Sequence, residues 1–218
     1  MTNRAEKRRF TLIEMLAVVT IASIMIAIFV PSFNRMMFGS KVEQAASNFK
    51  LGLEMAQSQA ISSRRYVAMI VPTLYGEASS SLKSYCDGGY RLAFVKKSGS
   101  TTSFVDWVPG SSWRNPRDGA ALSEHSGSLK SISGSSSSVS ADDSNKEDWD
   151  RLGHADNRKA VVFSPYGGTD GNEDFTFTFK EAKFTGNVDS NKAVYEYPND
   201  DNSLTLSVKG ITGRVKYQ

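Results

Sequence analysis

A single ionisable side chain, that of Glu14, lies in the otherwise uncharged and largely apolar residues 10–34. Placing a carboxylate in the hydrocarbon of a bilayer costs about 3 kcal/mol. Glu14 stands about one helical turn from the start of this stretch. Its carboxylate therefore either reaches the polar interface of the membrane or requires a cationic partner inside it.

Two cations alternate at the end of the chain, where Arg214 and Lys216 project from one face of a predicted strand at residues 213–217. Cations in this arrangement can contact phosphates, although lysine lacks the bidentate fork of arginine. From Tyr66 onward the chain has 17 basic and 19 acidic residues, so its net charge of 17 − 19 = −2 disfavours DNA binding. A solvated strand face is favoured, and a DNA contact is the alternative.

The sequence contains no residue pattern that is typical of a catalytic site or a metal site. His125 and His154 belong to no His-Glu-x-x-His motif, and the chain has no Gly-x-Ser-x-Gly or phosphate-binding loop. Cys86 has no activating neighbours in the sequence and is expected to be a packing residue of a turn or strand. The acidic turn at 143–147 lacks the glycine and the closing glutamate of an EF-hand calcium loop. The similar acidic turns at 170–174 and 200–202 are expected to be solvated turns. We predict no enzyme activity, no cofactor and no metal site.

We predict that the apolar stretch is helical, because its twenty uncharged residues 15–34 would then span about 30 Å, the thickness of the hydrocarbon core of a bilayer. An apolar stripe at three- and four-residue spacing continues it from Val42 to Ala60. We predict one helix over residues 10–64, with its first part, 10–34, in a membrane. Pro31 is expected to kink it.

Residues 1–9 carry four basic side chains and one acidic side chain, which gives 4 − 1 = +3, the net charge of the whole chain. Basic segments before an apolar span stay on the cytoplasmic side. We therefore expect a cytoplasmic N-terminus and a head outside the membrane. The apolar run is longer than that of a signal peptide and ends without a small-x-small cleavage site, so the span is predicted to stay.

After residue 65 the sequence changes to short β-like runs separated by glycine, proline, asparagine and aspartate. No βαβ alternation is present, which favours an antiparallel, β-rich head over 65–218 and an α+β fold. The predicted strands are 66–71, 90–95, 103–108, 160–163, 175–179, 204–208 and 213–217.

Residues 123–140 contain ten serines in eighteen positions, and an acidic stretch follows to residue 150. Such a composition buries too little apolar surface to offset the entropy of ordering. We predict a disordered surface loop over about 123–150.

The residues Phe10-Thr11-Leu12-Ile13-Glu14 resemble the prepilin processing motif of type IV pilins and type II secretion pseudopilins. Phe10, Glu14 and Pro31 stand at the spacings of that family. The resemblance implies a lollipop-like α+β subunit that a prepilin peptidase cleaves between Arg9 and Phe10, with N-methylation of Phe10. Arg9 departs from the family, which usually has glycine there. Either the peptidase tolerates arginine, or the leader 1–9 remains.

The resemblance also implies a partner for Glu14, namely the Phe10 ammonium of a neighbouring subunit. This α-amine exists only after cleavage. A desolvated charge pair of this kind fixes the register between subunits, because a mismatched subunit leaves Glu14 unpaired in lipid.

Two further segments, 162–167 (Val-Phe-Ser-Pro-Tyr-Gly) and 212–215 (Thr-Gly-Arg-Val), resemble GspH/FimT-type minor pseudopilins and pilins. The expected function is therefore that of a minor pilin or pseudopilin, a structural subunit of a type IV pilus or type II secretion pseudopilus. Its expected partners are a prepilin peptidase, other pilin subunits and the bacterial inner membrane. The alternatives are a DNA-binding minor pilin of natural transformation, with Arg214 and Lys216 as contacts, or a membrane-tethered domain that never polymerises.

Overall fold

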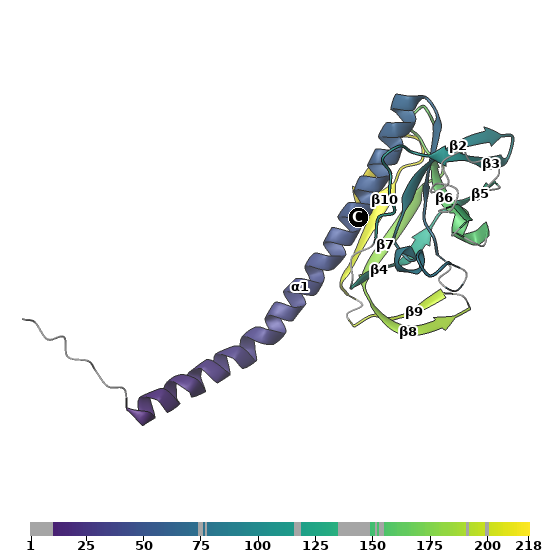
Figure 1. The fold of residues 1–218 in the computed structure, drawn as a ribbon. Helices are drawn as coiled ribbons and strands as arrows, with labels where there is room; N and C mark the ends of the chain where they lie inside the picture. Colours follow the sequence, from purple (N-terminus) through teal and green to yellow (C-terminus); the bar gives the residue numbers. More distant parts are fainter. Residues whose placement is uncertain are drawn as a thin grey trace, which may run out of the picture. The chain divides into compact units, whose positions relative to one another are not determined.

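The computed structural model describes residues 11–73, 76, 78–115, 119–134, 149–150, 152, 155–190, 192–198 and 201–218. The chain divides into two compact units, Met1–Phe38 and Gly39–Gln218. We call the second unit the head. Helix α1 (Leu12–Ser63) contributes to both units, and all strands belong to the head (Figure 1).

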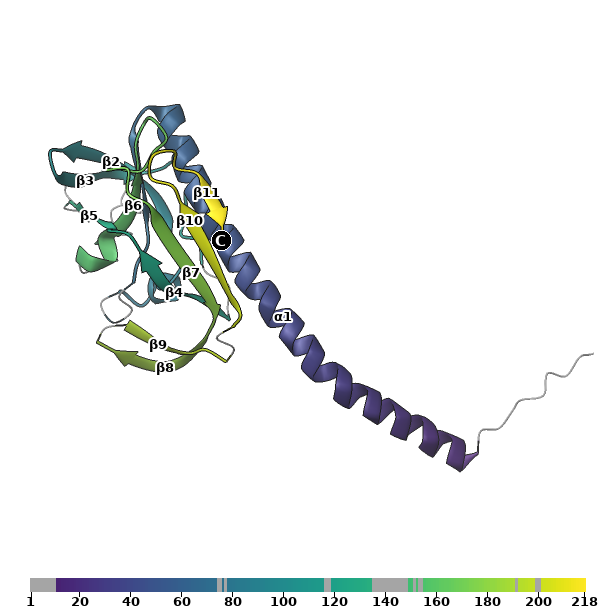
Figure 2. The same ribbon diagram turned by 180° about the vertical axis from the view of Figure 1, so that it is seen from behind.

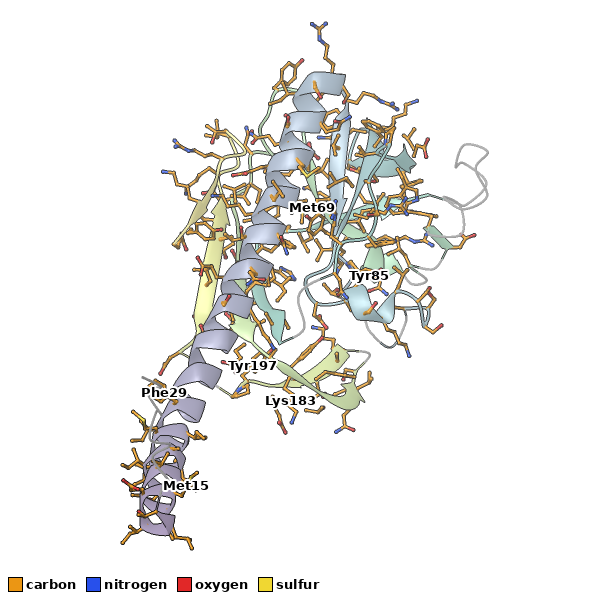
Figure 3. The ribbon with its side chains drawn as sticks, turned by 60° about the vertical axis from the view of Figure 1, so that its left-hand side comes forward. Met15, Phe29, Met69, Tyr85, Lys183 and Tyr197 are labelled. Atoms are coloured by element: carbon orange, nitrogen blue, oxygen red, sulfur yellow. The ribbon has the colours of Figure 1, made fainter. Side chains whose placement is uncertain are left out.

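In the first unit, α1 exposes apolar side chains on all sides from Leu12 to Phe29. Met15 and Phe29 lie at the two ends of this segment in Figure 3. These 18 residues have a mean hydropathy of 2.5 and are long and apolar enough to cross a membrane. The helix continues without interruption through Pro31 and Gly39.

In the head, α1 buries the apolar stripe that its spacing predicts: Val42, Ala45, Ala46, Phe49, Leu53, Ala56 and Ala60. Gly52 on this segment faces the ring of Tyr90, which occupies the space that a Cβ atom would need. The hydroxyl of Tyr90 donates a hydrogen bond of 2.9 Å to the carbonyl of Asn48. Gly52 therefore allows close packing and does not break the helix.

Five strands form a closed barrel in the order β1-β2-β3-β5-β6, and four strands form a sheet in the order β11-β10-β7-β4. The barrel strands are β1 (Tyr66–Ile70), β2 (Arg91–Ser98), β3 (Thr101–Trp107), β5 (Lys130–Ser133) and β6 (Lys159–Phe163). The sheet strands are β4 (Ala120–Ser126), β7 (Phe175–Glu181), β10 (Ser203–Val208) and β11 (Val215–Tyr217). Short 3₁₀ helices lie at Lys83–Tyr85 and Ala155–Arg158.

Strands β8 (Lys183–Asp189) and β9 (Lys192–Glu196) pair only with each other in the described part of the head. The predicted antiparallel arrangement is confirmed for the described strand pairs, except for β3 and β5, which are parallel. The α+β fold class is confirmed as well.

The four-stranded sheet packs its apolar face on α1, and Figure 2 shows β10 and β11 beside the helix. Phe175, Phe177 and Phe179 alternate along β7 and are buried. The ring of Phe49 lies 4.9 Å from that of Phe177 and 5.2 Å from that of Phe179. This aromatic cluster fixes the helix on the sheet.

The prediction of a disordered loop over 123–150 is wrong at both ends. Residues 123–126 belong to β4 and residues 130–133 form β5. Trp149 is fully buried and its ring stacks on Phe104 at 4.1 Å. Serine hydroxyls form hydrogen bonds with side chains of neighbouring strands here, as in the 2.7 Å hydrogen bond between the hydroxyls of Ser126 and Thr176. The serine-rich composition therefore did not prevent strand formation. Residues 135–148 lie outside the described residues.

Candidate assembly sites

Glu14 and Thr11 form a reciprocal cap at the start of α1. The Oε2 atom of Glu14 accepts hydrogen bonds from the backbone N–H of Thr11 (2.8 Å) and from its hydroxyl (2.9 Å). In return, the backbone N–H of Glu14 donates to the Thr11 hydroxyl oxygen at 3.4 Å. This is the capping-box arrangement, in which each residue satisfies a backbone donor of the other. The Thr-x-x-Glu spacing was visible in the sequence but Thr11 was not predicted as a site residue.

Arg9 and Phe10, the residues of the predicted cleavage site, lie outside the described residues. Pro31 lies within α1, but its side chain is also outside the description.

At the C-terminal end of α1, the Gln57 side chain joins two loops. Its Nε2 atom donates to the carbonyl of Gly167 (2.7 Å) and to the carbonyl of Thr212 (2.6 Å). Gly213 has a φ of +65° and approaches both Gly167 and Gln57, so only glycine fits there without strain. The two segments that resemble the GspH/FimT-type proteins, 162–167 and 212–215, are thus brought together by one helix side chain.

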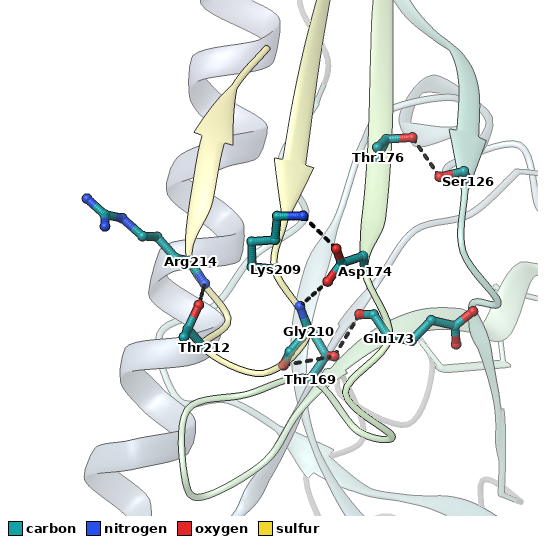
Figure 4. Close-up of polar contacts among 9 residues, drawn as sticks. All are labelled: Ser126, Thr169, Glu173, Asp174, Thr176, Lys209, Gly210, Thr212 and Arg214. Atoms are coloured by element: carbon teal, nitrogen blue, oxygen red, sulfur yellow. Dashed lines mark hydrogen bonds and ion pairs between the residues drawn. The ribbon is translucent and has the colours of Figure 1, made fainter.

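Asp174 reinforces the second of these loops, as Figure 4 shows. Its Oδ1 atom accepts the backbone N–H of Gly210 at 2.7 Å, and its Oδ2 atom lies 2.7 Å from Nζ of Lys209. These contacts hold the pKa of the Asp174 carboxyl below its usual value, the Gly210 bond being the larger cause. Asp170 lies 2.5 Å from Nζ of Lys97. The acidic turn at 170–174 therefore serves internal ion pairs and hydrogen bonds.

The loops held by Gln57 and Asp174 present apolar side chains to solvent. Tyr166 is 94% exposed, Ile211 is 77% exposed and the neighbouring Ile61 of α1 is 50% exposed. A Cβ atom at Gly167 would lie 3.1 Å from Cδ1 of Ile61, and a Cβ atom at Gly168 would lie 2.7 Å from the carbonyl oxygen of Ile211. We call Ile61, Tyr166 and Ile211 the apolar knob of the head.

The two cations proposed as DNA contacts are both exposed. Arg214 lies in the turn before β11, with its backbone N–H 3.3 Å from the Thr212 hydroxyl, and its guanidinium extends away from Lys209 and Asp174 in Figure 4. Lys216 is on β11, opposite Ser207 of β10. Arg64, at the end of α1, is exposed as well. Arg64 and Arg214 each follow a knob residue, Ile61 or Ile211, by three positions in the sequence.

A groove of about 530 Å³ runs between the first helical turns of the head and the start of β10. Leu204 contributes apolar surface, whereas Val42 is only 2% exposed. Tyr217 contributes a ring that is 43% exposed and lies 4.6 Å from Nζ of Lys50, and Glu43 contributes an exposed carboxylate. The remaining lining residues are Gln44, Ser47, Asn202 and Ser203.

A second hollow, of about 420 Å³, lies at the β8–β9 hairpin and contains Asp87, His125 and Tyr195. Burial raises the pKa of the Asp87 carboxyl to about 6, although the Tyr195 hydrogen bond and Lys192 act in the opposite direction. Burial, with smaller effects of Lys159 and Lys192, lowers the pKa of His125. Burial thus favours the neutral forms of Asp87 and His125 in this hollow. Neither Asp87 nor Tyr195 was predicted from the sequence.

Cys86 is buried, and burial together with the charge of Asp87 raises the pKa of its thiol to about 12, so it is a packing residue. No group of three potential metal ligands occurs among the described residues. His154 lies outside them.

Comparison with known proteins identifies the family. The sequence model described as type II transport protein GspH matches residues 45–195, more than half of the chain. No curated protein matches significantly. Among solved structures, two crystal forms of the type IV minor pilin FimU of Pseudomonas aeruginosa strain PAO1 are similar. In space group P21 the TM-score is 0.41 at 13% identity, covering 82% of this chain and 89% of that chain. In space group P65 the TM-score is 0.40 at 13% identity, and the match covers 81% of this chain and 91% of that chain.

The matching family consists of structural subunits and not of enzymes, and its members interact with other pilin subunits. The expectation of a pilin-like structural subunit is thereby confirmed. An apolar N-terminal helix of membrane-spanning length fits this assignment. The chain belongs to the GspH family of type II transport proteins.

Proposed function

We propose that this protein is a minor pilin or pseudopilin that is inserted in the bacterial inner membrane through residues 10–34 and then joins a filament through the same segment. The observation that carries the proposal is the apolar segment of α1 from Leu12 to Phe29, which exposes its side chains all round and holds one carboxylate, Glu14. Such a surface can be buried either by lipid or by the helices of neighbouring subunits.

Orientation follows from the charge of residues 1–9, which keeps the N-terminus in the cytoplasm and places the head outside. A prepilin peptidase then cleaves between Arg9 and Phe10, and methylation follows at the Phe10 amine. Cleavage replaces a polybasic leader by a single cation close to Glu14. The span can then leave the membrane without carrying the leader across it.

The Glu14 carboxylate fixes the register between neighbouring subunits of the filament. In the described part of the chain both hydrogen bonds from Thr11 end on Oε2, so Oε1 can accept from the Phe10 ammonium of a neighbouring subunit. Thr11 holds the carboxylate at the helix start and thereby reduces the number of orientations that the incoming amine must match. A subunit docked out of register would leave this charge unpaired in an apolar environment.

Substitution of Glu14 by glutamine tests the proposal, because the amide oxygen can still accept the Thr11 bonds while the charge is lost. We expect the full-length variant to reach the membrane at the parental level, to keep a folded head, and to lose crosslinks to co-expressed pilin subunits. Glu14→Ala should behave in the same way. The matched control is Glu54→Gln, which removes an exposed carboxylate on the same helix, 3.8 Å from Lys50.

Parental crosslinking of Glu14→Gln would show that the charge has no part in assembly. A chain that stays in the membrane with no crosslinks to any pilin, parent included, would instead support the tethered domain that never polymerises.

A further inference from the structure

The hollow at the β8–β9 hairpin collects polar side chains from four separate parts of the chain. His125 lies on β4, Lys159 begins β6, Lys192 begins β9, and Asp87 lies in the turn before β2. Figures 1 and 2 both show β4 next to the hairpin. The tertiary fold, and not the local sequence, therefore brings these groups to one place.

Hydrogen bonds fix the position of Asp87 in the hollow. Its backbone N–H donates to the carbonyl of Pro72 at 3.1 Å, and its carbonyl accepts the backbone N–H of Leu122 at 2.8 Å. From β9, the hydroxyl of Tyr195 donates to its carboxyl group at 3.3 Å. The hollow is therefore preformed, so a ligand would lose little affinity to the ordering of its walls.

Two of the lining side chains have hydrogen-bonding capacity that the head does not use. In the described part of the chain, neither the His125 imidazole nor the Lys192 ammonium takes part in a hydrogen bond or an ion pair. The ammonium has three donors, and the neutral imidazole has one donor and one acceptor. Both groups can therefore bind a ligand without breaking a contact within the head.

The pKa shifts show that positive charge acts on His125. Burial lowers its pKa, and the charges of Lys159 and Lys192 lower it further. Burial raises the pKa of Asp87 to about 6, so below this pH its carboxyl group is neutral and carries a proton that it can donate. An anion in the hollow would thus meet two ammonium groups and two neutral groups.

Glu124 is the lining residue that opposes an anion. With Asp87 and His125 in their neutral forms, the lining residues carry two lysines and one glutamate, which gives 2 − 1 = +1. The Glu124 side chain is exposed, so solvent screens its repulsion. The balance of charge therefore favours an anionic ligand.

The size and the remaining lining indicate more than an inorganic ion. The hollow has a volume of about 420 Å³, within the range of about 300–1,000 Å³ that is typical of sites for organic ligands. Leu122, Ala193 and Tyr197 add apolar and aromatic side chains to it. A carboxylate that is attached to a partly apolar carbon skeleton can use both kinds of surface.

We propose that this hollow binds a short acidic peptide, whose carboxylate contacts Lys159, Lys192 and His125. The inference goes beyond the proposed function, because it assigns a ligand site to the head that does not involve residues 10–34. The peptide belongs to another protein that the head meets outside the membrane.

Nuclear magnetic resonance of the full-length chain in detergent tests this site. The chain has two histidines, so ¹³C-labelled imidazole rings give few signals, and His125→Gln assigns the signal of His125. The probe is the peptide acetyl-Ala-Tyr-Glu-Ala-amide. Its addition should shift the His125 signal to saturation and raise the pKa of this imidazole, because a nearby anion favours the protonated form. Added salt should weaken the binding.

Two control ligands separate the carboxylate from other causes of a shift. The same peptide with glutamine in place of glutamate keeps the size and the ring, and it should bind about ten-fold more weakly or worse, since it loses the attraction to two lysines. Inorganic phosphate supplies an anion without a carbon skeleton and should also bind more weakly than the acidic peptide.

Substitutions of opposite sign then test the charges. Lys192→Gln should lower the affinity for the acidic peptide by about three- to five-fold, and Glu124→Gln should raise it by up to about the same factor. Lys183→Gln removes an exposed lysine of β8 that does not line the hollow, and it should leave the affinity unchanged. Circular dichroism of each variant should match the parent, so that lost binding is not lost folding.

Three results would overturn the inference: an unmoved His125 signal, equal affinity for the glutamate and glutamine peptides, or tighter binding of phosphate than of the acidic peptide. A folded Lys192→Gln variant with parental affinity would remove Lys192 from the site and overturn it as well. None of these results depends on crosslinking through Glu14, so the proposed assembly function stands or fails separately.

Discussion

The hydroxyl of Tyr195 on β9 donates a hydrogen bond of 3.3 Å to Oδ2 of Asp87, a residue 108 positions earlier in the chain. It joins the separate β8–β9 hairpin to the turn before β2. Asp87 itself has a left-handed backbone conformation, with a φ of 61°. A partly buried carboxylate in a left-handed backbone conformation thus anchors a hairpin that is mostly exposed.

This anchor predicts that the free energy of unfolding falls as the pH rises from 3.8 through about 6. Because burial raises the pKa of Asp87 from 3.8 to about 6, the folded state favours the protonated form. The resulting stabilisation is complete below pH 3.8 and is lost as the pH passes 6, by up to about 3 kcal/mol of unfolding free energy. This loss of stability is measured by thermal unfolding of the full chain in detergent across the pH range, monitored by near-ultraviolet circular dichroism.

Asp87→Asn should flatten this dependence, because the amide is neutral throughout the range. Asp189→Asn, at an exposed position of the same hairpin, is the control and should keep the parental profile. An unchanged pH profile in Asp87→Asn would assign the effect to other groups.

Gln57→Leu should loosen the two loops that carry the apolar knob. The change leaves the carbonyls of Gly167 and Thr212 without this donor, at a cost of about 1–3 kcal/mol in unfolding free energy. Hydrogen exchange should increase at 166–168 and 210–213 before it increases in β7. Gln44→Leu, which removes a bond only to Ser40 on the same helix, should change stability by less than about 0.5 kcal/mol. Equal protection of the loops in both variants would contradict this role.

DNA binding is expected to be weak or absent at physiological salt, because the residues from Tyr66 onward have a net charge of −2. Fluorescence anisotropy of the full chain in detergent with a labelled duplex measures it across a salt series. Tight binding that falls steeply with salt, and that is lost in Arg214→Ala but kept in Lys183→Ala, would instead support the DNA-binding alternative.

Processing is expected to yield a chain that begins with N-methylated Phe10. Mass spectrometry of protein purified from its native host measures the terminus. Arg9→Gly restores the residue usual in the family and should leave the fraction processed unchanged or higher. An intact leader in the parent, cleaved only in Arg9→Gly, would show that Arg9 blocks the peptidase and that Glu14 needs another partner.

The helix and the strands with strong period-two patterns could be predicted from sequence. The stripe from Val42 to Ala60 repeats at helical spacing, and the phenylalanines of β7 alternate, so burial on one face was visible in each. Strands β4, β5, β8 and β9 were missed. β4 and β5 lie in or next to serine-rich sequence, and β8 and β9 are mostly exposed, so neither pair has the alternation that marks one buried face.

Among the residues of the candidate sites, some could likewise be predicted from the sequence and others could not. Glu14 was evident because a lone charge among apolar residues is conspicuous. Gln57 and the Asp87–Tyr195 pair were not, since each acts on residues more than 100 positions away. Such contacts depend on which loops the sheets bring together, and that information is absent from local spacing.

The fixed ends of the serine-rich segment have a practical consequence. The indole N–H of Trp149 donates to the carbonyl of Gly134 at 3.4 Å, and Arg158 donates to the same carbonyl at 3.2 Å. The chain thus leaves and re-enters the barrel side of the head at one place, whatever lies between. Closing a longer loop costs only about 0.6 kcal/mol for each doubling of its length. An epitope tag or fluorophore acceptor inserted between residues 135 and 148 should therefore report on the head without disturbing its core.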